Sequence, residues 1–186
     1  MRFMSMIFTL LLAQSAFAGL MFEPSIGFGS GSLGGTTKTG ETLTPTEYSG
    51  LNIGVRLGYR WGESWLALDA GQISGTGKAG SSSYDMSDTN IGLLYGYDQK
   101  TFRFYGGYMP SSVIKQKDSA STEASYSGSA VKIGVGRFLT PKVTINLELV
   151  WHMFSKVKAG ETEASVSDVY GSLKAAPIGL TFGYVF

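Results

Sequence analysis

The last nine residues of this 186-residue chain alternate between bulky apolar side chains and small or semi-polar ones. The bulky positions are Ile178, Leu180, Phe182, Tyr184 and Phe186. Because successive side chains of a β-strand point to opposite faces, a period of two predicts a strand with one apolar and one lean face. Such a dense apolar stripe is a poor ending for a water-soluble domain, so the pattern favours a strand that faces something other than water.

The N-terminus predicts a secretory signal peptide at residues 1–18. Arg2 supplies a positive charge, residues 6–12 form a short apolar run, and Ala16-Phe17-Ala18 is a small-residue cleavage site. The mature chain is then expected to begin at Gly19 and to form one domain over residues 19–186. The alternative is an uncleaved membrane anchor, which the shortness of the apolar run disfavours because a spanning helix needs about 20 residues.

Composition narrows the fold class to all-β. The chain has no cysteine, which excludes disulfides and thiolate metal sites, and its formal charge of +1 argues against a nucleic-acid-binding surface. Its 26 glycines disfavour helices, since each glycine costs roughly 1 kcal/mol against alanine in a helix interior. No apolar run after the signal peptide approaches the ~20 residues of a membrane-spanning helix.

Period-two alternation predicts eight antiparallel strands, joined in an up-and-down order. Three connections are tight, at residues 62–64, 98–100 and 140–142, and four are long, at residues 31–48, 75–88, 112–128 and 156–172. Short turns at one end and long loops at the other are typical of transmembrane β-barrels, whose long loops are extracellular. The expected strands are residues 20–30, 49–61, 65–74, 89–97, 102–111, 129–138, 143–155 and 173–186.

The bulky face of each strand is expected to meet lipid. The interior of an eight-stranded barrel is only just wide enough for side chains, and the bulky set would overfill it. A soluble barrel with the bulky set inside is the alternative. Two aromatic girdles are expected at the headgroups. The girdle at the turn end comprises Tyr59, Trp61, Trp65, Tyr97, Phe102, Tyr184 and Phe186. The girdle at the loop end comprises Phe28, Tyr48, Tyr108, Trp151 and Tyr170.

Together these features resemble the small eight-stranded outer-membrane β-barrels of the OmpA/OmpX type. The resemblance implies a location in the bacterial outer membrane, with outer-membrane lipids and lipopolysaccharide as neighbours, and a monomeric state. It also implies that the barrel-assembly machinery reads the C-terminal strand as a signal. The residues that fit this signal are Leu180, Phe182, Tyr184 and Phe186.

Six charged residues fall on the inward face of the predicted strands, three acidic and three basic. A buried charge without a partner costs several kcal/mol, so a balanced set predicts a salt-bridge network that fills the lumen. The alternative is a gated ion path through a network that rearranges. The six residues are Glu23, Arg56, Asp69, Arg103, Lys132 and Glu148.

No enzymatic, metal or cofactor function is expected from the motifs. Some barrels of this size modify lipid A, and the deacylases among them place a His and a Ser two positions apart on one strand face. Here the single histidine, His152, is followed by Ser155, three positions on and on the other face. Residues 172–186 also offer no carboxylate. Palmitoyltransferase relatives use His, Asp and Ser near the outer rim, for which Asp88 and Ser87 are only loose candidates.

The function expected from the sequence is a structural or surface-interaction role through four long extracellular loops. A small pore or passage for small or hydrophobic molecules is the alternative, and a lipid A modifying enzyme is less favoured. Nucleic acid is not an expected partner. The composition of the loops does not name the molecule that they contact.

Overall fold

The computed structural model describes residues 19–118 and 123–186. The cleavage site predicted at Ala16 and Ala18 lies outside these residues. Leu20, the second described residue, already belongs to the first strand. Within the described ranges no helix is long and apolar enough to cross a membrane, and the single helix, α2, has four residues.

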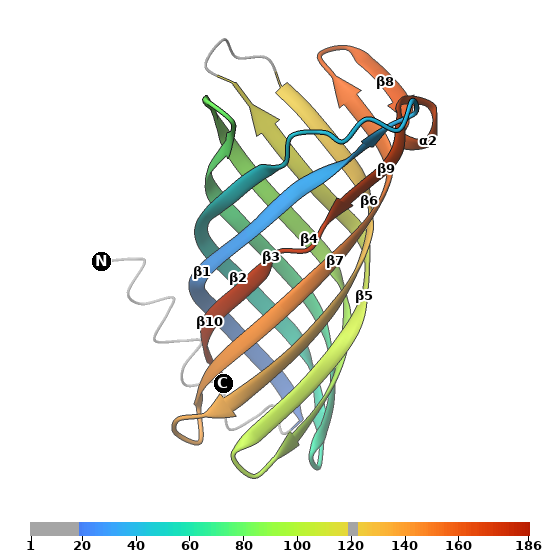
Figure 1. Cartoon of the computed structure of the whole chain (residues 1–186). Helices are drawn as coiled ribbons and strands as arrows, with labels where there is room; N and C mark the ends of the chain where they lie inside the picture. The colour runs from blue at the N-terminus through green and yellow to red at the C-terminus, as the bar shows by residue number, and fades with distance from the viewer. Residues whose placement is uncertain (1–18, 119–122) are drawn as a thin grey trace, which may run out of the picture.

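Long antiparallel strands dominate the fold, as Figure 1 shows. Each pairs with the next along the chain, and β10 pairs with both β1 and β7, which closes the sheet into a barrel. The predicted all-β, eight-stranded up-and-down architecture is confirmed. The elements are β1 (Leu20–Thr37), β2 (Thr46–Trp61), β3 (Ser64–Ala79), β4 (Ser82–Gln99), β5 (Phe102–Lys117), β6 (Glu123–Phe138), β7 (Val143–Ala159), β8 (Thr162–Ser165), α2 (Val166–Val169), β9 (Tyr170–Ala175) and β10 (Ile178–Tyr184).

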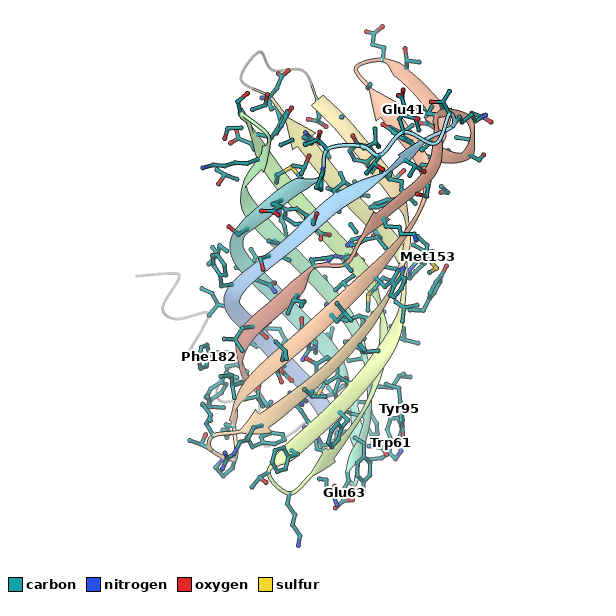
Figure 2. The ribbon with its side chains drawn as sticks, viewed as in Figure 1. Glu41, Trp61, Glu63, Tyr95, Met153 and Phe182 are labelled. Carbon is teal, nitrogen blue, oxygen red and sulfur yellow. The ribbon has the colours of Figure 1, made fainter. Side chains whose placement is uncertain are left out.

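The outer wall is apolar on every strand in the part of the barrel nearest the short turns. Leu68 is 61% exposed and Ile133 is 54% exposed, although both are large aliphatic residues. Figure 2 shows Phe182, Tyr95 and Trp61 standing outside the ribbon in the same way. The expectation that the bulky set faces outward is therefore confirmed, and the soluble barrel with an apolar interior is excluded for this part of the chain.

The strands are much longer than predicted, and most of the predicted long loops are strand. The clearest case is 75–88, expected as a loop, where β3 and β4 pair up to Ala79 and Ser82 around a two-residue turn. Gly80 has a φ of 59°, the left-handed conformation that glycine adopts readily in such turns. The prediction failed because it looked only for strands whose outward side chains are apolar.

Above the apolar band the polarity of the two faces is reversed. Outward positions there carry hydroxyls and charges, such as Thr76, Lys78 and Asp85, while inward positions carry apolar side chains. The inward cluster is Leu33, Tyr48, Met86, Ile114 and Ala175, with Tyr84, Tyr126, Phe154 and Leu173 packed against it. We call this part of the barrel the extension, and the part below it the lower barrel.

Two of the predicted girdle residues point inward instead. Trp65 is fully buried and belongs to the apolar cluster of the lower lumen, and Tyr48 is buried in the extension. Both occupy the inward parity of their strands, since Leu66 and Leu51 point outward. Gly96 leaves room for the Trp65 indole, because a Cβ at residue 96 would overlap that ring.

The last predicted strand, 173–186, is broken in two at residues 176–177. Pro177 has no backbone N–H to donate, and β9 and β10 end on either side of it. The pairing of β10 with β7 ends at Ile178 and Leu149, and the pairing of β7 with β8 begins at Lys156 and Ser165. In the described residues, Trp151–Ser155 of β7 therefore have a paired strand only on the β6 side. We call the boundary between this stretch of β7 and the facing chain around Pro177 and β9 the seam.

Candidate functional site

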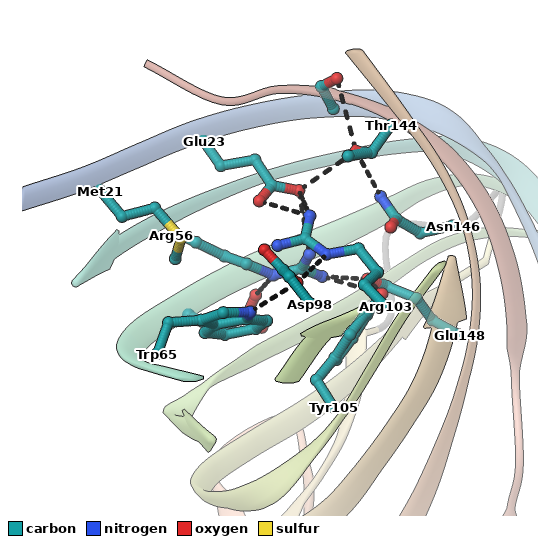
Figure 3. Close-up of polar contacts among 12 residues, drawn as sticks. Met21, Glu23, Arg56, Trp65, Asp98, Arg103, Tyr105, Thr144, Asn146 and Glu148 are labelled. Carbon is teal, nitrogen blue, oxygen red and sulfur yellow. Dashed lines mark hydrogen bonds and ion pairs between the residues drawn. The ribbon is translucent and has the colours of Figure 1, made fainter. Parts of the chain in front are cut away.

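The lower lumen is filled by a network of ion pairs centred on Arg56 of β2 (Figure 3). Its guanidinium lies 2.9 Å from Asp69 Oδ1 and 3.1 Å from Glu23 Oε1, and Nη2 also contacts Glu148 Oε1. These carboxylates come from β3, β1 and β7. Since strand register places Arg56 opposite both Glu23 and Asp69, neighbouring strands bring the three charges together at one height.

Arg103 of β5 is the second cation of the network and is completely buried. Its Nη1 lies 2.7 Å from Glu23 Oε2, and its Nε lies 3.2 Å from Asp98 Oδ1. Its Cζ lies 5.1 Å from the centroid of the Trp65 ring, within the range of a cation–π interaction. The Trp65 indole donates to Asp98 at 2.9 Å, so Trp65 and Arg103 hold the same carboxylate.

Lys132 of β6 completes the set of six predicted lumen charges. Its Nζ lies 2.6 Å from Asp69 Oδ2 and 3.7 Å from Glu148 Oε2. The structure therefore brings all six residues into one connected group, in which no carboxylate is left without a cation.

Several further residues of this network were missed from the sequence. Asp98 was assigned to a turn, but β4 continues to Gln99 and keeps Asp98 inward, where Arg60 also contacts it at 2.6 Å. Trp65 was placed in a girdle. Tyr105 donates to Glu148 Oε1 at 2.6 Å and lies under Arg56, with 4.4 Å between the ring centroid and Cζ. The signal was available, since Tyr105 shares its parity with Arg103 and Asp98 shares its parity with Asn90.

A second buried polar group lies higher in the lumen and contains the only histidine. His152 Nε2 lies 3.2 Å from Asp88 Oδ2, and His152 Nδ1 lies 2.6 Å from Ser112 Oγ. Asp88 also accepts from the Tyr48 hydroxyl at 3.0 Å and from Asn90 Nδ2 at 2.8 Å. We call these five residues the histidine cluster. They come from β2, β4, β5 and β7, and each is less than 5% exposed.

A small cavity lies between the two polar groups. Its volume is about 20 Å³, and its lining includes Asp88 and Asn90 from above and Lys132 and Glu148 from below. Such a volume is enough for about one water molecule. Above the histidine cluster, the apolar side chains of the extension pack against one another, with Ile114 and Met86 almost fully buried. The lumen is thus packed with side chains at both levels.

The sequence matches the model of the outer membrane protein beta-barrel domain family over residues 4–186. The chain belongs to this family. The resemblance to small outer-membrane barrels is confirmed at the level of family and fold, and the protein is located in the bacterial outer membrane. No curated protein matches the sequence.

Solved structures of other outer-membrane barrels are similar to this family member in fold. Neisserial surface protein A is 14% identical, with 90% of this chain and 99% of that chain covered and a TM-score of 0.52. Ail, the attachment invasion locus protein of Yersinia pestis, is 14% identical over 91% and 100% of the two chains, with a TM-score of 0.55. The outer membrane protein AlkL is 15% identical over 91% and 92%, with a TM-score of 0.57.

The predicted assembly signal lies along the outer face of β10. Leu180, Phe182 and Tyr184 point outward and are partly exposed, and the Phe186 ring lies 4.5 Å from that of Tyr184. Phe186 N also donates to Phe22 O at 2.9 Å, which ties the C-terminus to β1. Recognition of these side chains by the assembly machinery of this family remains a prediction.

Proposed function

We propose that the protein is a closed outer-membrane barrel whose extension makes contacts at the cell surface. The observation that carries this proposal is the reversal of polarity above the lipid band. A barrel wall that is polar outside and packed with apolar side chains inside is a stable, water-facing surface. The extension therefore offers an ordered, water-facing surface for contact with surface molecules.

Exposed ion pairs bridge the hairpin walls near the tips of the extension. Lys115 Nζ lies 3.0 Å from Glu123 Oε1 across β5 and β6, and Lys156 Nζ lies 2.8 Å from Glu163 Oε1 across β7 and β8. The hydrogen bond from Lys156 holds the pKa of Glu163 below its usual value and raises the pKa of Lys156. Both signs of charge are therefore displayed, so the proposal does not require a strongly anionic or cationic partner.

One similar structure supports an attachment role. Ail is described as an attachment invasion locus protein, and one of its structures contains the heparin analogue sucrose octasulfate. We extend this to the present chain only as a proposal, with lipopolysaccharide and host polysaccharides as the candidate partners. A monomer embedded in outer-membrane lipid is part of the same proposal.

The test is cell attachment with the extension shortened. Cells that display the wild-type barrel are compared with cells in which residues 76–85 of the β3–β4 hairpin are replaced by Asn-Gly, which retains a two-residue turn. We expect lower binding to immobilised heparin, to lipopolysaccharide or to epithelial cells, with an unchanged heat-modifiable band on gels. Undiminished binding after all four extracellular connections are shortened would overturn the proposal.

Passage of small hydrophobic molecules is the second candidate, and the seam favours it. At this line the wall between β7 and β9 lacks strand pairing in the described residues. The packed lumen favours the closed barrel instead.

Conductance in planar bilayers tests between the two. The purified wild-type protein is expected to show no steady conductance, and Arg103→Ala is expected to show a measurable one. Steady conductance of the wild type that Arg103→Ala abolishes would favour the passage.

A further inference from the structure

The histidine cluster has the hydrogen-bond order of a nucleophile, a base and an orienting carboxylate. Ser112 Oγ lies 2.6 Å from His152 Nδ1, and the other ring nitrogen lies 3.2 Å from Asp88 Oδ2. This order of groups is recognised by geometry and role rather than by position in the sequence. His152 and Asp88 were loose candidates in the sequence, but Ser112 was not, because the deacylase pattern places the serine two positions from the histidine on the same strand.

The surrounding donors fix the protonation pattern. Tyr48 and Asn90 both donate to Asp88, which stabilises its carboxylate as an acceptor. In the neutral tautomer that donates from Nε2 to Asp88, Nδ1 is the acceptor for the Ser112 hydroxyl. This is the tautomer in which a histidine can take the proton from a serine. Here Nδ1 faces the serine and Nε2 faces the carboxylate. In the Ser-His-Asp proteases Nε2 faces the serine and Nδ1 faces the carboxylate.

Irregularities in the wall occur at the height of this cluster. The register of β5 shifts between Met109 and Ser112 against β6 and between Tyr108 and Ser111 against β4, next to Pro110, and this bulge turns Ser112 inward. The register of β7 against β6 shifts at the step from Phe154 to Lys156, just above His152. Bulges that re-aim a side chain are found preferentially beside active sites.

The seam lies beside His152 in the wall of the barrel. His152 belongs to the stretch of β7 that lacks a second paired strand in the described residues, and Pro177 interrupts the facing chain. Apart from the seam, Trp151 and Met153 of β7 line an apolar groove of about 330 Å³ with Val131, Ile133 and Leu149, on the outer face of the paired strands β6 and β7. A groove of this composition suits an acyl chain from the membrane.

We propose that Ser112 is a base-activated nucleophile that acts on an ester of a long acyl chain reaching it through the seam. Ser112 Oγ forms a bond to the acyl carbonyl carbon while His152 Nδ1 takes the hydroxyl proton. The ester C–O bond then breaks, and the departing alkoxide receives that proton. Water, activated by His152, hydrolyses the acyl-serine to the fatty acid. Asp88 is a positioning residue for His152. This proposal is independent of the surface-contact role and goes beyond the sequence-based expectation of no enzymatic function.

The first test is covalent labelling of the folded barrel, in detergent and in vesicles, by a fluorophosphonate that bears a long alkyl chain. We expect one adduct by intact mass, mapped to Ser112, and slower labelling by a short-chain probe. Ser112→Ala should abolish the adduct, and His152→Gln should slow its formation about a hundredfold or more. The matched control Ser111→Ala, at the exposed neighbour, should label like the wild type. A folded wild-type barrel without an adduct at Ser112 overturns the proposal.

The second test separates an activated position from a merely buried hydrogen bond. The chain has no cysteine, so Ser112→Cys introduces a single thiol. A thiol paired with His152 should react with iodoacetamide with an apparent pKa below its usual value of about 8.5, and adding His152→Gln should remove this shift. The control Ser111→Cys should titrate normally. A thiol at residue 112 that stays unreactive, or that reacts only at ordinary alkaline pH, contradicts the proposal, provided that heat-modifiability shows a folded barrel.

Discussion

The lower barrel and the extension are built from the same strands with opposite polarity. In the lower barrel, aliphatic and aromatic side chains face outward and a network of charges fills the lumen. In the extension, hydroxyls and charges face outward and the lumen is apolar. Because β2 to β7 each run through both regions as single strands, the difference does not lie in secondary structure. The difference lies in the face of each strand that carries the apolar side chains. That face is the outer one in the lower barrel and the inner one in the extension.

The two regions are therefore expected to be stabilised by different forces. In lipid the apolar wall contacts acyl chains instead of other side chains of the protein, so the specific contacts within the lower barrel come from the charged lumen. In water the extension is stabilised by apolar burial in its interior, like a soluble β-protein. Substitutions at matched positions can separate these contributions.

The largest loss of stability is expected when Arg103, which links two carboxylates in the lower lumen, is replaced by alanine. Arg103→Ala leaves the buried Glu23 with Arg56 alone and removes the guanidinium from Asp98. Breaking a buried ion pair typically costs about 3–5 kcal/mol, because the remaining charge is uncompensated. The free energy of unfolding, measured by denaturant titration in micelles, should fall by that amount.

The matched control is Arg137→Ala on β6, where the arginine is exposed and lies 6.0 Å from the Phe102 ring centroid. Its effect should stay below about 1 kcal/mol, the usual size of an exposed cation–π contact. If the two variants lost the same stability, the lumen charges would not be the contacts that hold the lower barrel together.

The next effect tests the apolar interior of the extension. Ile114 is fully buried there, and truncation of a buried isoleucine to alanine usually costs about 2–5 kcal/mol. We expect Ile114→Ala to loosen the extension alone. Hydrogen exchange should become faster for amides of residues 82–90 and 112–117 and stay unchanged near the short turns.

Ile133→Ala is the control for this substitution, since Ile133 points outward in the lower barrel. Lipid can fill the space left by its side chain, so faster exchange is not expected. If Ile114→Ala accelerated hydrogen exchange equally in the two regions, the barrel would unfold as one unit. The two regions would then not be separately stabilised.

The strands and the lipid-facing side of the lower barrel could be predicted from the sequence because one pattern dominates there. Bulky residues at every second position identify both the strands and the lipid face, and Glu23, Arg56 and Arg103 follow by parity. The extension was missed because its outward residues are serine, threonine and lysine, which in isolation resemble loop composition. Only the inward series, such as Ile73 and Met86, reveals that the alternation continues.

The place of Ser112 in the histidine cluster could not be predicted from the sequence, for a geometric reason. Parity counted from Arg103 places Ser111, not Ser112, on the inward face, and the bulge beside Pro110 reverses this assignment. The contact between β5 and β7 also crosses the lumen over β6, where Ala130 is small. Neither the bulge nor the cross-lumen distance is encoded in strand periodicity.

The third prediction compares one charge placed on the outer face of each region of β3. Leu68→Arg puts the guanidinium into the apolar band, which costs about 2–4 kcal/mol near the bilayer midplane. Thr76→Arg occupies the same face of the same strand in the extension, where the change should be close to zero. Folding equilibria in lipid vesicles measure both. Equal costs would place residue 76 in the membrane and move the boundary between the two regions outward.

The smallest effect concerns a charge pair that belongs wholly to the extension. The contact with Lys156 lowers the pKa of Glu163, so the ion pair contributes above the unfolded pKa of the carboxyl and is lost as the pH falls through the lower, folded value. A titration followed by NMR should show this lowered pKa, and Lys156→Met should return it toward normal. Glu163 is fully exposed, so Glu163→Gln should leave the unfolding midpoint unchanged. A measurable shift in that midpoint would mean that surface charges, and not the apolar interior, hold the β7–β8 hairpin in place.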